Sequence, residues 1–178
     1  MGEFAASIAR ASRRTRAYAE KLVAGITPEM AARVPVVGGV TIQTNHASFL
    51  FGHLSLYPAR IAKVAGVSAE GLSVPEAWDG LFKVGAPCVD DPRSGQSTGH
   101  YPAFAALRDA FFQTYDTVVN RIEGLDDAVF ARVNPEERYR EAFPTVGPAC
   151  LFLLNNHVAM HMGQLSAWRR CMGLGSIS

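Results

Sequence analysis

Residues 155–165 read NNHVAMHMGQL, and this stretch contains two histidines, His157 and His161, four positions apart. In a helix, residues at that spacing lie one turn apart on the same face, offset by roughly 40°. Two neutral imidazoles placed in this way can bind one divalent metal ion from a rigid support. A histidine pair on a helix face is also common among ordinary surface or core side chains, so the remainder of the chain must decide between the two interpretations.

A second stretch of the chain is similar to the first. Residues 45–55, NHASFLFGHLS, align without gaps with residues 156–166, NHVAMHMGQLS, and the two stretches are identical at five positions. Parts of the segments 25–34 and 124–133 also match at constant spacing. The simplest account is two helical hairpins related by a pseudo-two-fold axis, and the alternative is chance similarity between amphipathic helices.

The alignment matches His46 with His157 and His53 with Gln164, so equivalent faces of two helices carry these polar groups, together with His161. The two faces are otherwise apolar. Three or four buried imidazoles that converge are difficult to satisfy by hydrogen bonds to one another, and they repel when protonated. A shared metal ion removes this difficulty, and the core of a helical bundle is a usual place for such a site. We therefore predict that the chain binds a metal.

Apolar residues recur at helical spacing in four long segments of the chain. These predicted helices cover residues 3–24, 45–66, 102–124 and 148–173. Pro58 is expected to kink or divide the second helix, and Asn45 is expected to cap it. Residues 75–82 can form a short amphipathic helix, and residues 33–40 are the only short strand candidate. We predict a single all-α domain over residues 1–178, a four-helix bundle built from the two helical hairpins with long connections.

Composition and charge exclude several classes of partner. The chain has 17 Lys and Arg against 16 Asp and Glu, and its one basic cluster, residues 10–16, is most simply a solvated helix face. We expect no nucleic-acid partner, because that would require clustered Lys and Arg. No apolar run approaches 18 residues, so we expect no membrane partner, and the N-terminus lacks the apolar core of a signal peptide. Three widely spaced cysteines predict reduced thiols in a cytoplasmic protein.

Two of these motifs resemble the DinB/YfiT-like superfamily. The Gly-His-Leu at residues 52–54, with an asparagine eight positions before its histidine, looks like the family's second helix, and H-x-x-x-H-x-G-Q-L at residues 157–165 looks like its last helix. The resemblance implies a four-helix bundle with a metal triad of one histidine from helix 2 and two from helix 4. By position these are His53, His157 and His161. It also implies a Zn or Ni ion, dimers in some members, and either thiol-dependent transfer or isomerisation, or amide hydrolysis, although many members have no known activity.

Three imidazoles leave at least one coordination position for water or substrate. A bound water would become acidic enough to supply hydroxide for hydrolysis, or a thiol cosubstrate would bind as a thiolate. Candidates that would orient the ligands or line the pocket are Gln164, Asn45, Asn156, His46 and, from the long connection 67–101, His100. His46 lies outside the implied triad, so it can also be a plain helix cap. The connection has the length of a lid, or of a mobile surface insertion.

Two classes of function remain open from the sequence. The first is a metal-dependent enzyme acting on a small-molecule substrate, either a hydrolase or a thiol-dependent S-transferase that uses a low-molecular-weight thiol. The second is a non-catalytic, stress-related bundle protein, in dimeric form, whose metal is structural or sensory. An open coordination position beside a roomy pocket favours the first class, and a closed fourth ligand or a sealed core favours the second. A haem bundle is a weaker idea, because the chain has no C-x-x-C-H motif.

Overall fold

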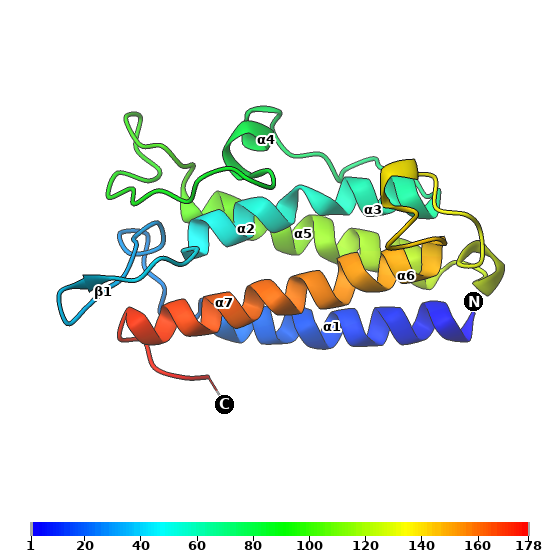
Figure 1. Cartoon of the computed structure of the whole chain (residues 1–178), viewed down its shortest axis with the longest axis horizontal. Coiled ribbons are helices and arrows are strands. Elements are labelled where there is room, and N and C mark those ends of the chain that lie inside the picture. Colours follow the sequence, from blue (N-terminus) through cyan, green and yellow to red (C-terminus); the bar gives the residue numbers. More distant parts are fainter. Residues whose placement is uncertain (1, 178) are drawn as a thin grey trace.

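Helices are the main regular structure of the fold, and they follow the order that the sequence predicts (Figure 1). The computed structural model describes residues 2–177. The α-helices are α1 (Glu3–Val23), α2 (Ala47–Ser55), α3 (Tyr57–Ala65), α4 (Ala77–Phe82), α5 (Phe104–Glu123), α6 (Val146–Leu151) and α7 (His157–Cys171). Two 3-10 turns, η1 (Asp127–Val129) and η2 (Glu137–Tyr139), and one π-helical turn, η3 (Phe152–Asn156), complete the helical part. The prediction of a mostly helical chain is therefore confirmed.

The first helix shows how local sequence and distant contacts combine. Buried residues such as Ile8 and Leu22 recur on one face of α1, as the 3.6-residue period requires. The first N–H groups of a helix have no partner within it. In α1, Phe4 and Ala5 donate theirs to the Asp127 carboxylate at 3.2 Å each. A side chain from η1 therefore caps a helix more than 120 residues away in sequence and favourably places its negative charge at that end.

Pro58 divides the second predicted helix, as expected. α2 ends at Ser55 and α3 begins at Tyr57, with the proline in the first turn of α3, where its missing N–H costs nothing. The predicted cap is wrong by one residue. His46, and not Asn45, occupies the N-cap position, and its Nδ1 accepts the Phe49 N–H at 3.1 Å.

The last predicted helix is not wound uniformly. Between α6 and α7 the chain makes the π-helical turn η3, which leaves some backbone groups outside the usual hydrogen-bond ladder. The Tyr115 hydroxyl, from α5, donates to the Leu154 carbonyl within this turn at 2.6 Å. His157 follows directly as the first residue of α7, so η3 sets the direction in which this side chain leaves the helix.

The helical segments pack side by side around one apolar core. α5 contacts α1, α2 and α3; α7 contacts α1 and α2; and α3 contacts α6. Figure 1 shows α2 and α3 running alongside α6 and α7, with α1 and α5 completing the array. Phe51 contacts the rings of Phe104 and Phe111 edge-on, at 5.6 and 5.4 Å between ring centroids, a favoured aromatic geometry. This packing brings the last turn of α2 beside the start of α7.

The connections contain little regular structure but are well tied to the helices. The strand candidate becomes a hairpin of β1 (Val36–Val37) and β2 (Val40–Thr41). In the long connection, the buried Asp91 carboxylate accepts the backbone N–H groups of Arg93, His100 and Tyr101 at 2.9–3.0 Å. Cys88, Cys150 and Cys171 are free thiols. Within residues 2–177, no helix combines the length and apolarity needed to cross a membrane.

Candidate metal centre

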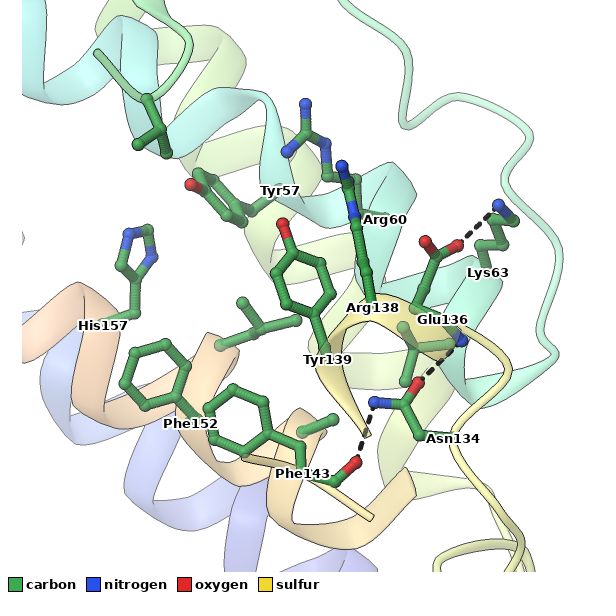
Figure 2. A pocket seen from close by; sticks show the side chains of 14 residues that line it. Tyr57, Arg60, Lys63, Asn134, Glu136, Arg138, Tyr139, Phe143, Phe152 and His157 are labelled. Carbon is green, nitrogen blue, oxygen red and sulfur yellow. Dashed lines mark hydrogen bonds and ion pairs between the residues drawn. The ribbon is translucent and has the colours of Figure 1, made fainter. Parts of the chain in front are cut away.

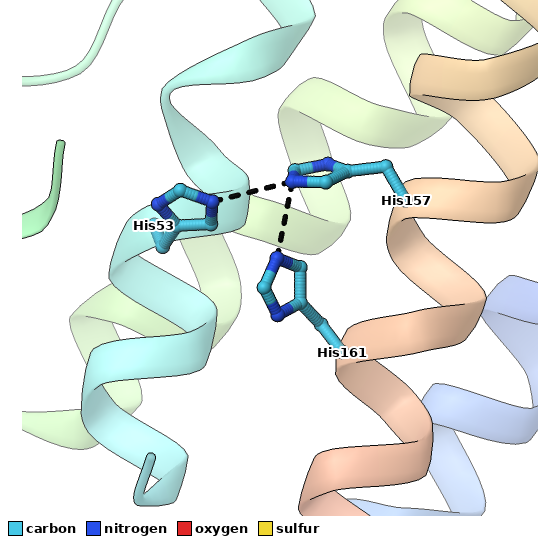
Figure 3. A group of neighbouring side chains, drawn as sticks. All are labelled: His53, His157 and His161. Carbon is cyan, nitrogen blue, oxygen red and sulfur yellow. Dashed lines mark hydrogen bonds between the residues drawn. The ribbon is translucent and has the colours of Figure 1, made fainter. Parts of the chain in front are cut away.

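Three histidines from two helices meet at one point (Figure 3). His53 comes from α2, while His157 and His161 come from successive turns of α7. The Nε2 atom of His157 lies 3.2 Å from Nε2 of His53 and 3.0 Å from Nε2 of His161. One ligand atom from each ring falls within 4.8 Å of the others. We call these three residues the histidine cluster, and they lie close enough together to hold one metal ion.

The other nitrogens of the cluster show which atoms face its centre with a lone pair. Nδ1 of His53 lies 2.7 Å from the Phe82 carbonyl oxygen, to which it can only donate. Nδ1 of His161 lies 2.9 Å from Oε1 of Gln164 and donates likewise. In a neutral imidazole the second nitrogen then carries a lone pair. Two lone pairs therefore point at Nε2 of His157, which has at most one proton to share between them.

A cation resolves this conflict better than any arrangement of protons. Two nitrogens bound tetrahedrally to one Zn²⁺ at about 2.0–2.1 Å lie about 3.3 Å from each other, close to the separations of 3.2 and 3.0 Å within the cluster. Binding through Nε2 would leave the proton of His157 on Nδ1, a buried atom with no hydrogen-bond partner among the described residues, so this ring lacks the outer partner that the other two have. The three side chains therefore fit a divalent metal ion.

Burial keeps the three imidazoles in the form that binds metals. It lowers the pKa of His157 to about 3, with further lowering from the neighbouring rings of His161 and His53. Burial also lowers the pKa of His53 and of His161. A protonated imidazole has no lone pair to offer, so metal affinity falls wherever protons compete for the ligands. At neutral pH these rings are neutral and free of that competition.

Gly52 explains how the Phe82 carbonyl reaches the cluster. A Cβ atom at residue 52 would lie 2.5 Å from the Phe82 ring, so only glycine allows that ring to rest against α2. The close approach brings the end of α4 to the helix face that carries His53. Sequence reasoning placed Phe82 in a short amphipathic helix but missed the contact of its carbonyl with His53, which lies 29 residues away in the chain. The glycine before His53 is the one signal that could have indicated a close neighbour.

The structure separates the predicted supporting residues into two groups. Gln164 contacts the cluster through His161. His46 is engaged elsewhere, because its Nδ1 caps α2 and its Nε2 donates to the Val89 carbonyl at 2.9 Å. Burial lowers the pKa of His46 to about 4, so its ring is neutral in both hydrogen bonds. Of the roles considered for it, the structure assigns His46 that of a helix cap that also holds the long connection.

The remaining predicted supporting residues do not reach the cluster. Asn45 is half-buried beside the α2 cap, and Asn156 is exposed at the end of η3 without a capping hydrogen bond. His100 is exposed on the long connection, where its ring packs edge-on against Tyr101 at 4.5 Å. Within residues 2–177, no hydrogen bond joins these side chains to the three histidines. The long connection thus contributes the Phe82 carbonyl and not His100.

A cavity of about 480 Å³ reaches the cluster at His157 (Figure 2). Tyr57 forms part of its wall, and the Tyr57 ring lies 4.3 Å from the ring of His157 and 5.0 Å from that of His53, between centroids. The volume lies in the range of cavities that bind small molecules.

Comparison with known proteins agrees with this architecture. A family model described as the DinB superfamily matches residues 11–165, which include His53, His157 and His161. The chain belongs to the DinB superfamily. Comparisons with curated proteins and with solved structures find no match. The family resemblance of the two histidine motifs is therefore confirmed.

Proposed function

We propose that this DinB-superfamily chain is a metal-dependent enzyme whose histidine cluster binds one Zn²⁺ or Ni²⁺ ion and acts on a small-molecule substrate. The observation that carries the proposal is the convergence of three Nε2 atoms, two of which present lone pairs because their Nδ1 atoms donate to Phe82 and Gln164. Outer partners of this kind fix the tautomer of a metal-binding histidine and the orientation of its ring.

The side chains and backbone groups around such a site would have two different roles, binding the ion and orienting its ligands. His53, His157 and His161 would hold the ion, and Gln164 and the Phe82 carbonyl would hold two of the rings in place. With three protein ligands, an ion of tetrahedral preference keeps a position for a further ligand. A bound ion would supply Lewis acidity for hydrolysis or for thiol-dependent transfer. The cavity at His157 favours a catalytic role over the alternative of a structural or sensory metal.

The finer architecture is part of the same proposal. We infer a four-helix bundle in which α1 with α2–α3 and α5 with α6–α7 form two hairpins related by a pseudo-two-fold axis. Contacts of α5 with α1 and α2, and of α7 with α1 and α2, run between the two hairpins and pair as such an axis requires, whereas the long helices within each hairpin make few contacts with each other in the described part of the chain. A cytoplasmic location and a homodimer stay predictions from the sequence.

Metal analysis of the purified protein tests the proposal directly. We expect one divalent ion per chain in the wild type and its loss in His161→Ala, because the variant removes one of three ligands. His100→Ala is the matched control, since that histidine is exposed and lies away from the cluster. A His161→Ala protein with full metal content would overturn the proposed site.

Thermal shifts then separate the two chemistries and the non-catalytic alternative. If a low-molecular-weight thiol is the cosubstrate, it should raise the melting temperature of the metal-loaded wild type but not of His161→Ala. Hydrolysis without a thiol predicts no such shift. A metal that binds tightly while the protein gains no stability from thiols and hydrolyses no substrate would favour a structural or sensory role.

A further inference from the structure

The cavity beside His157 has charged and aromatic walls that the metal site alone does not explain. Its lining includes Arg60, Lys63 and Arg138, and one carboxylate, Glu136. Three cationic side chains against one carboxylate leave an excess of two positive charges at its edge. Figure 2 shows His157 and Tyr57 at one end of the group and the Lys63–Glu136 ion pair at the other, with Arg60 and Arg138 between them.

The three cationic side chains of the cavity lie near the same carboxylate. Lys63 pairs with Glu136 at 2.5 Å and is the main cause of the lowered pKa of that carboxyl, to which Arg138 and Arg60 also contribute. All three cations therefore lie near Glu136, but Lys63 already satisfies it. Like charges gathered in this way repel one another, and an added anion would relieve that repulsion.

One guanidinium group has no polar partner among the described residues and the other has only a long contact, so both can bind such an anion. Arg138 lies over the Tyr139 ring at 4.6 Å, and within residues 2–177 it has no hydrogen bond or ion pair. Arg60 lies 5.4 Å from the Tyr57 ring centroid, and its ionic partner within residues 2–177, Asp79, is 3.5 Å away and about half exposed. That contact is too long to count as strong. Guanidinium N–H edges suit the two oxygens of a carboxylate.

The remaining walls suit an apolar group. Phe143 and Phe152 pack against each other with ring centroids 4.9 Å apart, and both line the cavity together with Tyr57. The wall that carries Arg138 is itself well held. The buried Asn134 side chain donates to the Phe143 carbonyl and accepts the Glu136 N–H, both at 3.0 Å. The cavity is therefore formed before any ligand enters.

We propose that this cavity binds a small carboxylate with an aromatic or apolar body, its anionic end between Arg60 and Arg138 and its body directed along the aromatic wall toward His157. This inference rests on the proposed function, because it names the substrate class that would be presented to the histidine cluster. The carboxylate anchors the molecule away from His157, so the part that reacts is the opposite end.

Calorimetric titration with three probes tests the proposal on the metal-loaded wild type. The probes are 3-phenylpropanoate, its neutral amide, and acetate. We expect 3-phenylpropanoate to bind at least about tenfold tighter than the amide, because hydrogen bonds to charged groups are the stronger ones. Acetate should bind more weakly still, because it has no apolar body to bury. Equal affinity for the acid and the amide, or no binding of the acid at millimolar concentration, would overturn the proposal.

Single substitutions locate the binding. Arg60→Gln and Arg138→Gln should each weaken binding of 3-phenylpropanoate about tenfold while leaving the affinity for the amide unchanged. Arg14→Gln is the matched control, because Arg14 is an exposed residue of α1 that does not line the cavity. Unchanged affinity in both pocket variants would place the ligand elsewhere and overturn the assignment.

The same titration on His161→Ala keeps this inference separate from the metal proposal. His161 does not line the cavity, so the variant should still bind 3-phenylpropanoate. If the wild type carries no metal but binds the carboxylate, the proposed function fails and the carboxylate site stands. If the metal is present and the acid is not preferred over the amide, the carboxylate site fails alone.

Discussion

The two similar stretches of the chain, 45–55 and 156–166, use aligned histidines for different purposes. His46 begins a helix, and both of its ring nitrogens are bound within the fold, to Phe49 and Val89. His157 occupies the equivalent position, but its Nε2 faces two other imidazoles and its Nδ1 has no hydrogen-bond partner among residues 2–177. The comparison teaches that the residue type alone does not identify a ligand. A histidine whose two ring nitrogens are both bound within the fold has none left for a metal.

The largest difference between the two histidines should appear in metal content. His157→Asn removes a ligand, and we expect it to lose the metal. His46→Asn removes a ring of the same type from the aligned position, but asparagine is itself a good helix cap, so this variant should keep the metal and lose only part of its stability. Metal analysis and melting temperatures of the pair provide the measurement. Equal loss of metal in both variants would mean that the two stretches do not differ as described.

The loss of folding stability at acidic pH should sharpen the comparison by testing the role of His46. Its pKa is about 4 in the folded protein and about 6.5 in an unfolded chain. As the pH falls, the unfolded state therefore binds the proton at residue 46 first. The contribution of His46 to the free energy of unfolding is lost between about pH 6.5 and pH 4, and this residue causes no further loss below that range. The difference amounts to about 3 kcal/mol in the free energy of unfolding.

Denaturant titrations at pH 7 and pH 4 measure this effect. His46→Asn has no titrating ring at residue 46, so its stability should fall less over the same interval than that of the wild type. The comparison is best made with metal removed from both proteins, because protonation of the histidine cluster would otherwise add metal release. An identical pH dependence in the two proteins would show that burial does not hold His46 neutral.

The smallest expected effect concerns the other aligned pair, His53 and Gln164. Gln164 does not bind the metal itself but accepts the Nδ1 proton of His161. Loss of such an outer partner usually costs about 10- to 100-fold in metal affinity, and we expect Gln164→Ala to lie near the lower end because residue 164 is exposed. Asn156→Ala, from the same stretch, should not change the affinity. Competition with a metal chelator measures both.

Much of this arrangement could be predicted from the sequence because it is periodic. The helical spacing of apolar residues predicted the ends of α1 and α5 to within about two residues. The spacing of His157 and His161 predicted that both lie on one face of α7. The position of His53 came from a family motif and not from periodicity. These features depend on local winding or on short recognisable patterns, so a single chain is enough to find them.

The rest depends on contacts that no local pattern records. Asn45 was preferred as a cap on propensity, but the next residue takes the N-cap position and its ring accepts the Phe49 N–H. The π-helical turn η3 does not interrupt the apolar pattern, so the sequence predicts one continuous helix there. The Phe82 carbonyl and the charged wall at Arg138 come from connections whose course is set by buried anchors such as Asp91 and Asn134. Such anchors are visible only once the chain is folded.

The π-helical turn also determines how this site can change over evolutionary time. Each residue of an α-helix advances the direction of its side chain by about 100°, and a π turn holds one residue more than an α turn. Deleting a single residue from Phe152–Asn156 would therefore leave an ordinary α turn there and keep α7 near its present rotation relative to the start of α6. The same deletion within the regular helix Val146–Leu151 has no extra residue to remove, so it would rotate both histidines of α7 away from His53 in one step, without altering any of the three.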